Sequence, residues 1–527
     1  MRKTLPLFAL FAVLAVPLRA RAGAEAESVR VKLDTVVASI VDGGLIAKAD
    51  DATFLRRVWI DLAGQVPPAL VVREFLNDKD PEKRAGMVDR LLNSEDFGDH
   101  WARVLAIWTT NERPISRDTY DGRVLHEFLR ERLKSGVSYD RIVRELITGT
   151  GASDASGPAN FLLRYEADAP RLAGAVGKNL LGITIQCAQC HDHPFARWKE
   201  QDFWGFAAAF ARVRKMEGGG DDNLKAIVEA RRGELMRPDP AAPAAKEDED
   251  EDEDEEGAEP GPKKIAVRPR FLDGKPILGR DRRAALAGWV VGRDNPLFAR
   301  NLVNRVWEQL FGKALVPNLD NSTAKADSLP VLTLLAEDFA ANSHDLRHLL
   351  RTVVLSKTYG QPSSPRARPS WGRPSARPMS VDQLHASIAQ ATGYDGDPGE
   401  IGDTPFRAAD ALDAEEPAVA DLGEPAADAP DSAAEALGER SLTLQRALVL
   451  LNSEFVHEAS RSAARVSRAT LGRTNDAAQF EWACLATLGR KPSGEELAVF
   501  RPLLNHPNGL EDVYWVLINS SEFLGIH

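Results

Sequence analysis

A run of ten consecutive acidic residues, Glu247–Glu256, constrains the fold of this chain more than any other stretch. Carboxylates at this density repel one another and cannot share a core, so the run predicts a disordered linker. With Glu259 it accounts for eleven acids, and their removal takes the formal net charge from −12 to −1. The rest of the chain is therefore close to neutral. It lacks the basic surplus of a nucleic-acid binder, and we expect no nucleic-acid partner.

Apolar residues recur at helical spacing on both sides of this linker. Phe97, Trp101, Leu105 and Trp108 share one face of a helix, for which Ser94 is the expected N-cap. No convincing series of alternating apolar and polar residues indicates a sheet. The predicted fold class is therefore mainly α, with two helical parts separated by the disordered acidic linker.

Helices are also predicted where similar spacing recurs: 139–147, 171–181, 281–291, 301–311 and a helix that follows an N-cap at Ser343. Residues 395–440 are rich in Ala, Asp, Glu and Pro, and we expect a disordered insertion there. These features predict a division into a signal peptide (1–22), an N-terminal helical domain (29–212), the acidic low-complexity linker (213–268) and a C-terminal helical domain (269–527).

The first residues have the pattern of a secretory signal. Arg2 and Lys3 precede the apolar stretch Leu5–Leu18, and Ala20-Arg-Ala22 offers small residues for cleavage. Fourteen apolar residues are fewer than the roughly 20 that span a bilayer. No later segment is apolar over 18 residues. We therefore expect an exported, periplasmic or extracellular protein without a transmembrane segment in its mature form.

Two of the three cysteines stand in Cys187-Ala-Gln-Cys190-His191-Asp-His193. Cys-x-x-Cys-His is the attachment signature of c-type haem. Thiols three positions apart reach the two vinyl groups of one porphyrin edge, and the adjacent histidine is placed as an axial iron ligand. In bacteria this haem is attached outside the cytoplasm, which agrees with the expected export. The motif therefore predicts haem c on Cys187, Cys190 and His191.

Two other chemistries fit the same residues. His193 adds a fourth ligand, so Cys187, Cys190, His191 and His193 are candidates to hold Zn²⁺ or another transition metal. Four ligands within seven residues are tightly spaced for one tetrahedral ion. In an oxidising compartment the two cysteines are also able to form a disulfide. The residues alone leave haem, metal and disulfide open.

The surroundings of the motif indicate packing rather than chemistry. Phe203, Phe206 and Phe210 have helical spacing, which favours a core face, and Cys484 is expected to be a small buried residue. His100 is a candidate distal ligand only because it is a histidine in the same part. The sequence contains no G-x-S-x-G, P-loop or H-E-x-x-H pattern. We therefore predict no catalytic residues and favour a non-enzymatic role.

Further distinctive stretches accompany the motif. In the first half they are Asp51–Gly64, Val88–Leu92, Tyr139–Leu146 and Ile185–Phe195 with Trp198 and Asp202-Phe203. In the second half they are Pro269–Leu272, Asp294–Pro296, Phe298–Arg300, Val303–Trp307, Phe311-Gly312, Asp345-Leu346, His348-Leu349 and Leu517–Leu524. On these residues the sequence resembles the planctomycete secreted-cytochrome paralogue family. That family pairs an N-terminal cytochrome-associated domain with a C-terminal planctomycete-specific domain, both of unknown function.

The resemblance implies a secreted, redox-linked role and places the Cys/His motif of the family on Cys187, Cys190, His191 and His193. Relatives often carry Asn-Pro-Pro-Ser-His-Pro after the Val-Asn-Arg-Val-Trp segment, whereas Lys325–Pro330 here lacks the histidine. We expect electron transfer or redox partnering with another protein. The alternative is a non-redox structural or interaction protein with a Zn²⁺ site or disulfide at the same motif.

Overall fold

The computed structural model describes residues 28–41, 44–117, 119–193, 196–217, 224–238, 264–317, 319, 328–363, 370–394, 451, 453–472 and 476–527. Three predicted segments lie outside these residues. They are the signal peptide, the acid run Glu247–Glu256 and the insertion 395–440.

Helices dominate the described residues, which confirms the predicted mainly α fold. The chain forms two compact units. Unit 1 comprises Met1–Val104, Leu302–Pro317 and Lys325–His527, and unit 2 comprises Leu105–Asn301 and Asn318–Ala324. The units therefore alternate along the sequence, and two helices, α5 (Glu95–Thr110) and α12 (Pro296–Phe311), contribute residues to both.

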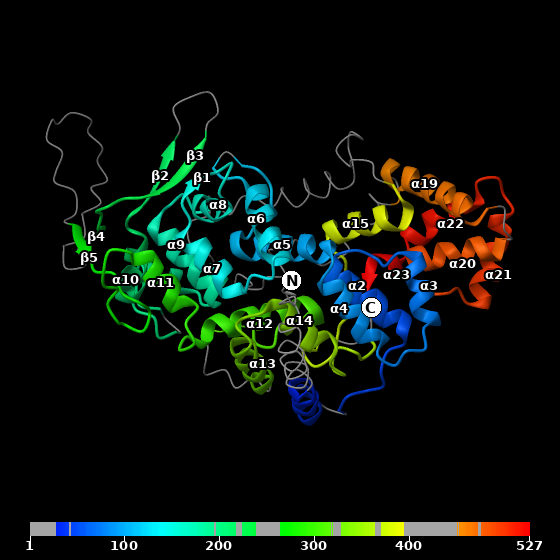
Figure 1. The fold of residues 1–527 in the computed structure, drawn as a ribbon, viewed down its shortest axis with the longest axis horizontal. Coiled ribbons are helices and arrows are strands. Elements are labelled where there is room, and N and C mark those ends of the chain that lie inside the picture. Colours follow the sequence, from blue (N-terminus) through cyan, green and yellow to red (C-terminus); the bar gives the residue numbers. More distant parts are fainter. Residues whose placement is uncertain are drawn as a thin grey trace, which may run out of the picture. The chain divides into compact units, whose positions relative to one another are not determined.

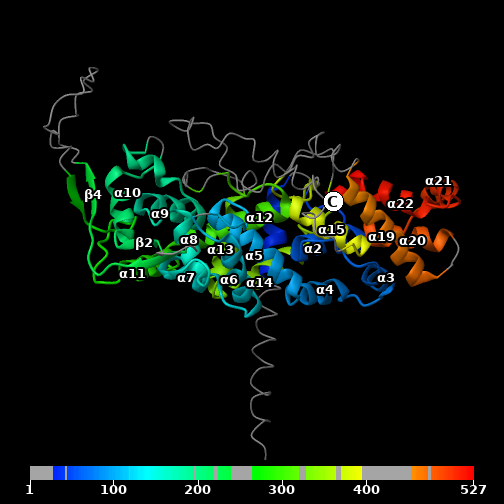
Figure 2. The same cartoon turned by 90° about the horizontal axis from the view of Figure 1, so that it is seen from above.

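Unit 1 consists of helices and one short strand pair. After a helix over residues 28–40, its elements are α2 (Asp51–Ala63), α3 (Ala69–Asn77), α4 (Lys83–Leu92), α13 (Leu329–Ala341), α14 (Leu346–Val354), β6 (Arg377–Pro378), α15 (Val381–Thr392), α19 (Glu454–Leu471), α20 (Asp476–Thr487), α21 (Gly494–Leu504), α22 (Gly509–Ile518), α23 (Ser521–Leu524) and β7 (Gly525–Ile526). Helix α19 packs on α15 and α22 (Figure 1). Helix α3, from early in the chain, lies beside α20 in both views (Figures 1 and 2).

Helix α2 is buried over most of its length, and its sequence fixes both of its ends. The Asp50 side chain accepts a hydrogen bond from the Thr53 amide at 2.8 Å and caps the N-terminus. Gly64 ends the helix with a φ of 74°. A Cβ at that position would lie 2.6 Å from Nδ1 of His100. Both the left-handed conformation and the close approach of the imidazole therefore require glycine.

Unit 2 combines helices with two small sheets. Its elements are α6 (Gly122–Lys134), α7 (Tyr139–Thr148), β1 (Gly151–Ala152), α8 (Gly157–Arg164), α9 (Ala169–Ala175), a π-helix (Val176–Leu181), a 3₁₀ helix (Ile185–Gln189), α10 (Glu200–Ala207), a 3₁₀ turn (Ala208–Phe210), β2 (Val213–Glu217), β3 (Lys225–Glu229), β4 (Leu235–Pro238), β5 (Lys264–Val267) and α11 (Arg282–Val290). The predicted helices near 139–147, 171–181 and 281–291 are found here.

The strands correct the expectation that residues 213–268 form only a linker. Strand β3 pairs antiparallel with β2, where Lys215 lies opposite Ile227, and with β1, where Gly151 lies opposite Ile227. Strand β4 pairs with β5 at the far end of the same segment. Only Val213 and Ile227 among the apolar residues of β2 and β3 are buried. The period-2 pattern was therefore too sparse to be recognised in the sequence.

Two predicted N-caps have different outcomes. Ser94 caps α5, since its hydroxyl accepts a hydrogen bond from the Phe97 amide at 3.1 Å, as predicted. Ser343 does not cap α14. It has a φ of 57°, and the Asp345 side chain accepts from the Arg347 amide at 2.9 Å instead. Because the backbone at Ser343 is left-handed, the N-cap lies two residues later, at Asp345. Aspartate is as good an N-cap as serine.

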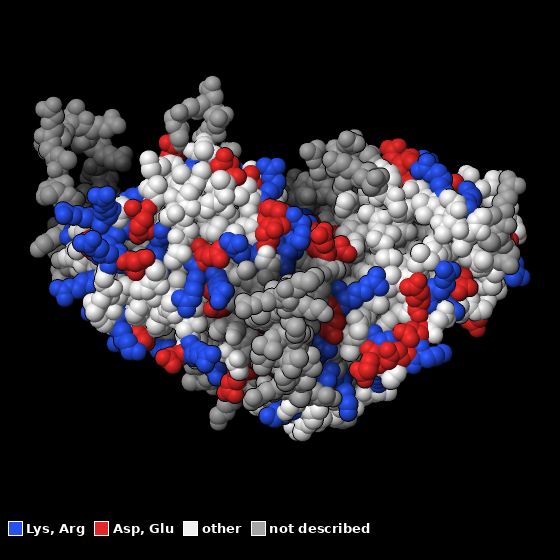
Figure 3. Space-filling view, viewed as in Figure 1, with Lys and Arg blue, Asp and Glu red and all other residues white. Residues whose placement is uncertain are grey.

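In the part of the chain that the structure describes, no helix combines the length and apolarity needed to cross a bilayer. Lysine and arginine are interspersed with aspartate and glutamate on the face drawn in Figure 3. This mixture agrees with a nearly neutral chain outside the acid run.

Candidate functional site

The Cys/His motif of unit 2 follows a change of helix type. Helix α9 is capped by Asp168, whose side chain accepts from the Arg171 amide at 2.9 Å. It continues as the π-helix Val176–Leu181, which ends at Gly182 with a φ of 68°. Single π turns inside helices occur frequently at functional sites. The chain then reverses, and the Ile183 amide donates to the Gly177 carbonyl at 3.0 Å.

Two glycines let the motif lie directly against this helix. A Cβ at Gly174 would lie 1.7 Å from Oε1 of Gln186. A Cβ at Gly177 would lie 2.8 Å from Cγ1 of Ile185. Real Cβ atoms do not approach other atoms so closely. The side chains at the start of the motif therefore pack directly on the backbone of α9 and of the π-helix. Any residue larger than glycine would prevent this approach.

The 3₁₀ helix Ile185–Gln189 presents the thiols to solvent. It buries Ile185 and Ala188 completely and leaves Cys187 exposed. Cys190 is the residue that ends this helix and is also exposed. In a 3₁₀ helix residues three apart lie above one another, but Cys190 lies one residue beyond the last helical residue, Gln189. Neither forms a disulfide in this structure.

The residues after the motif are anchored to α10. The Trp204 indole Nε1 donates to the Gln189 carbonyl at 3.0 Å. The Asp192 carboxylate accepts from the Glu200 amide, also at 3.0 Å. A carboxylate at the first amide of a helix is favoured by the unpaired N–H group and the helix dipole. Residues on both sides of His191 are therefore fixed by the same helix.

The two histidines differ in which ring nitrogen is occupied. Nδ1 of His191 lies 2.9 Å from the Asp192 carbonyl oxygen. A carbonyl only accepts, so Nδ1 carries the proton and Nε2 keeps its lone pair. Nδ1 of His193 instead accepts from the Ala196 amide at 2.9 Å, which leaves the proton of the neutral ring on Nε2. In its neutral form His191 is therefore a competent ligand through Nε2, whereas His193 is not.

The donors of the motif can be compared with what a closed metal site and haem attachment each require. Among the described residues no three His, Cys, Asp or Glu side chains are gathered so that they could hold a metal ion. A tetrahedral site on Cys187, Cys190, His191 and His193 would therefore require the loop to rearrange. Haem attachment needs two accessible thiols and one imidazole oriented by a backbone carbonyl, and these are present.

The remaining residues considered with the motif are packing residues. Phe203, Phe206 and Phe210 are completely buried, as predicted for a core face. Cys484 is buried in unit 1, which confirms its predicted packing role. His100 also belongs to unit 1, where burial and the neighbouring Arg103 lower its pKa to about 3.

Helix α2 carries a group of buried charges that sequence reasoning missed. Asp61 is completely buried and forms an ion pair with Arg377. It also accepts a hydrogen bond from the Tyr359 hydroxyl at 2.7 Å. Arg57 donates to the Tyr359 carbonyl at 2.6 Å. The available signal was the presence of charged residues inside an otherwise apolar helix, because such residues are rarely buried without partners.

Comparison with known proteins gives two family matches. Residues 42–215 match the PSCyt2 family, described as a protein of unknown function (DUF1549). Residues 282–395 match the PSD1 family, described as a protein of unknown function (DUF1553). No curated protein and no solved structure matches the chain. With both domains in this order, the chain belongs to the planctomycete family that pairs these two domains of unknown function.

Proposed function

We propose that this protein is exported and carries a c-type haem on Cys187, Cys190 and His191, through which it exchanges electrons with another protein. The observation that carries the proposal is the arrangement of the motif. Cys187 in a 3₁₀ helix and Cys190 directly after it are both exposed and free, and His191 beside them has Nε2 as its unprotonated nitrogen. The name of the PSCyt2 family agrees with this assignment but supplies no chemistry.

Each residue of the motif has a distinct part in this proposal. Cys187 and Cys190 would hold the porphyrin edge by thioether bonds. His191 would bind the iron through Nε2, with the Asp192 carbonyl fixing its tautomer and the orientation of its ring. The group supplies one-electron redox chemistry when bound. Exposure of the motif suits close approach by a partner protein, which rapid electron transfer requires.

A visible spectrum of the mature protein tests the proposal. The chain is produced in a host with c-type maturation, beside Cys187→Ala and Cys484→Ala variants. We expect a Soret band and the covalent mass of one haem in the native chain and in Cys484→Ala, because Cys484 is buried away from the motif. Cys187→Ala is expected to keep its haem through the remaining thioether at Cys190 and to show shifted visible bands in the reduced state, because one vinyl group then stays unreacted.

Other outcomes would support the alternative, a structural or interaction protein. Absence of the Soret band together with stoichiometric zinc would contradict the haem proposal and favour a metal site. Absence of both, with a Cys187–Cys190 disulfide in a peptide map, would contradict it in favour of a structural or redox-active disulfide. N-terminal sequencing of the secreted product tests the accompanying proposal that residues 1–22 are removed on export.

A further inference from the structure

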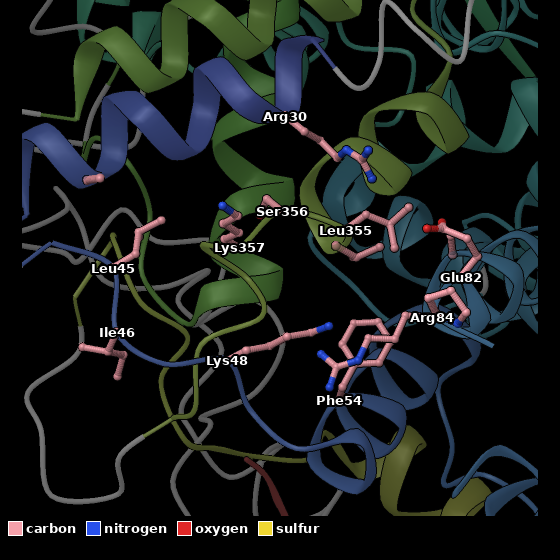
Figure 4. Close-up of a pocket in the computed structure, with 14 residues that line it drawn as sticks. Arg30, Leu45, Ile46, Lys48, Phe54, Glu82, Arg84, Leu355, Ser356 and Lys357 are labelled. Atoms are coloured by element: carbon pink, nitrogen blue, oxygen red, sulfur yellow. The ribbon is translucent and has the colours of Figure 1, made fainter. Parts of the chain in front are cut away.

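Unit 1 contains a cavity whose lining is strongly cationic. Its volume is about 630 Å³, within the range of small-molecule sites. Its basic lining residues are Arg30, Lys48, Arg84 and Lys357, and its acidic lining residue is Glu82. Figure 4 shows these side chains arriving from separate segments of the chain. The apolar lining consists of Ala38, Leu45, Ile46, Phe54, Pro81, Ala85, Val354 and Leu355.

Arg84 supplies a hydrogen-bond donor that the protein does not use. Its Nε donates to the Asp51 carboxylate and its Nη2 to the Ala49 carbonyl, both at 2.8 Å. Its guanidinium lies over the Phe54 ring, 4.5 Å from the centroid. The third nitrogen, Nη1, is buried and has no hydrogen-bond partner in the structure. An unpaired donor on a buried cation is costly, and a ligand oxygen would satisfy it.

Lys48 extends across the cavity toward Arg84 and Phe54 (Figure 4). Among the described residues it makes no hydrogen bond or ion pair. Its pKa is lowered by burial and by the charge of Arg84. The nearest acid, Asp51, is already paired with Arg84 and with Lys83 at 2.7 Å. Lys48 thus faces the cavity without a counter-charge of its own, while Arg84 shares the Asp51 carboxylate with Lys83.

The opposite wall of the cavity is held in place by hydrogen bonds to a second carboxylate, that of Asp34. The amide of Lys357 donates to Asp34 at 3.0 Å, and the amide of Thr358 donates to the other oxygen of that carboxylate at 2.9 Å. These bonds fix the loop after α14 to the helix over residues 28–40, which also carries Arg30. Because Asp34 is occupied by backbone amides, it is not placed as a partner for the Lys357 ammonium.

We propose that this cavity binds an organic oxyanion, a small molecule with a carboxylate, sulfate or phosphate group on an apolar body. The anionic group would meet Lys48 and Nη1 of Arg84. The apolar body would lie against Phe54, Leu355 and Ile46. The site is independent of the Cys/His motif, since none of its residues belongs to unit 2.

Calorimetric titration of the full chain with three probes tests the site. Benzoate has both the anionic group and the apolar body, benzamide lacks the charge, and sulfate lacks the apolar body. We expect benzoate to bind at least about tenfold more tightly than either of the other two, because both halves of the ligand are recognised. Equal affinities for benzoate and benzamide would overturn the proposal that the site recognises an anionic group. Equal affinities for benzoate and sulfate would overturn the proposal that it recognises an apolar body.

Two lysine variants locate the binding. Lys48→Met is expected to weaken benzoate binding about tenfold, whereas Lys313→Met is expected to leave it unchanged, because Lys313 is exposed and lies outside the cavity. A labelling measurement avoids dependence on the variant fold. In the native chain benzoate should protect Lys48, but not Lys313, from an amine-directed acylating reagent read by peptide mass spectrometry. Equal protection of both lysines, or of neither, overturns the proposal.

Discussion

The hydroxyl of Tyr359 donates a 2.7 Å hydrogen bond to the carboxylate of Asp61, and both side chains are completely buried. Burial and the adjacent carboxylate raise the pKa of Tyr359 well above its ordinary value. With Arg377 as the counter-ion of Asp61, the group joins α2 to segments about 300 residues later in the chain. The group is therefore one of the links that hold the early and late parts of unit 1 together.

Removal of the Asp61 charge should therefore be strongly destabilising. We expect Asp61→Asn to lower the free energy of unfolding by about 3–5 kcal/mol, because it leaves Arg377 buried without its counter-ion. Asp89→Asn breaks a half-exposed pair with Arg351 and is expected to cost no more than about 1 kcal/mol. Urea unfolding of both variants checks this, and equal losses would refute the assignment.

Arg56 should control the stability of the last described segment. It donates to the carbonyls of Thr487 at 2.7 Å and Phe523 at 2.8 Å. We expect Arg56→Met to leave both carbonyls unpaired at a cost of about 3 kcal/mol. Hydrogen exchange over residues 521–526 should become faster. Arg501→Met, at an exposed position of α21, is the control and should leave this exchange unchanged.

His100 should make unit 1 sensitive to mild acid. Burial, together with the charge of Arg103, lowers its folded pKa from 6.5 to about 3. As the pH falls, the unfolded state therefore binds the proton before the folded state does. The contribution of His100 to the free energy of unfolding is complete above pH 6.5 and is lost as the pH falls toward 3. Between pH 7 and 5.5 we expect the titration of this residue to lower the free energy of unfolding by about 1 kcal/mol.

The pH slope isolates that contribution. His100→Gln should flatten the change in unfolding free energy between pH 7 and 5.5, because its side chain does not titrate. His506→Gln, at an exposed position, should retain the slope of the native chain. A slope that is the same in all three proteins would show that His100 is not kept neutral by folding.

The two motif histidines should be separable by substitution in the haem-loaded protein. His191→Ala is expected to shift the Soret maximum, because Nε2 of this residue is the proposed iron ligand. His193→Ala should leave the maximum in place and cost about 1 kcal/mol of stability, since it removes the hydrogen bond from Ala196. Identical spectra for the two variants would contradict these roles.

Thiol labelling of the cofactor-free chain should distinguish its cysteines. Burial raises the pKa of Cys484 to about 12, so at pH 8 only about one part in 10⁴ is thiolate. Cys187 and Cys190 are exposed. We expect iodoacetamide to label these two in the native chain, and Cys484 only after denaturant is added. Mass spectrometry follows the number of labels, and native-state labelling of Cys484 would refute its burial.

Local patterns in the sequence were sufficient where a structure depends on neighbouring residues. The apolar spacing around Trp101 predicted α5, and Ser94 predicted its start. The aromatic face of Phe206 predicted a core position. In each case the partner that decides the outcome lies within a few residues, so a period or a cap is visible without knowledge of the fold.

Features that depend on distant partners were not predictable. Arg377 follows Asp61 by 316 positions, and nothing near either residue indicates the pair. The β3 register depends on Gly151, which lies far upstream. At the motif, spacing identified both histidines, but their different tautomers depend on backbone groups that only the folded loop places.

The contacts of Arg56 also bear on the order in which the two units can form. Its acceptors Thr487 and Phe523 follow it by 431 and 467 positions, so nearly the whole chain must be present before this part of unit 1 can close. Unit 2 is almost entirely the continuous segment Leu105–Asn301 and is complete much earlier. Cys187 and Cys190 therefore lie in the unit that can form first, while the helices at the start of the chain still wait for their last partners.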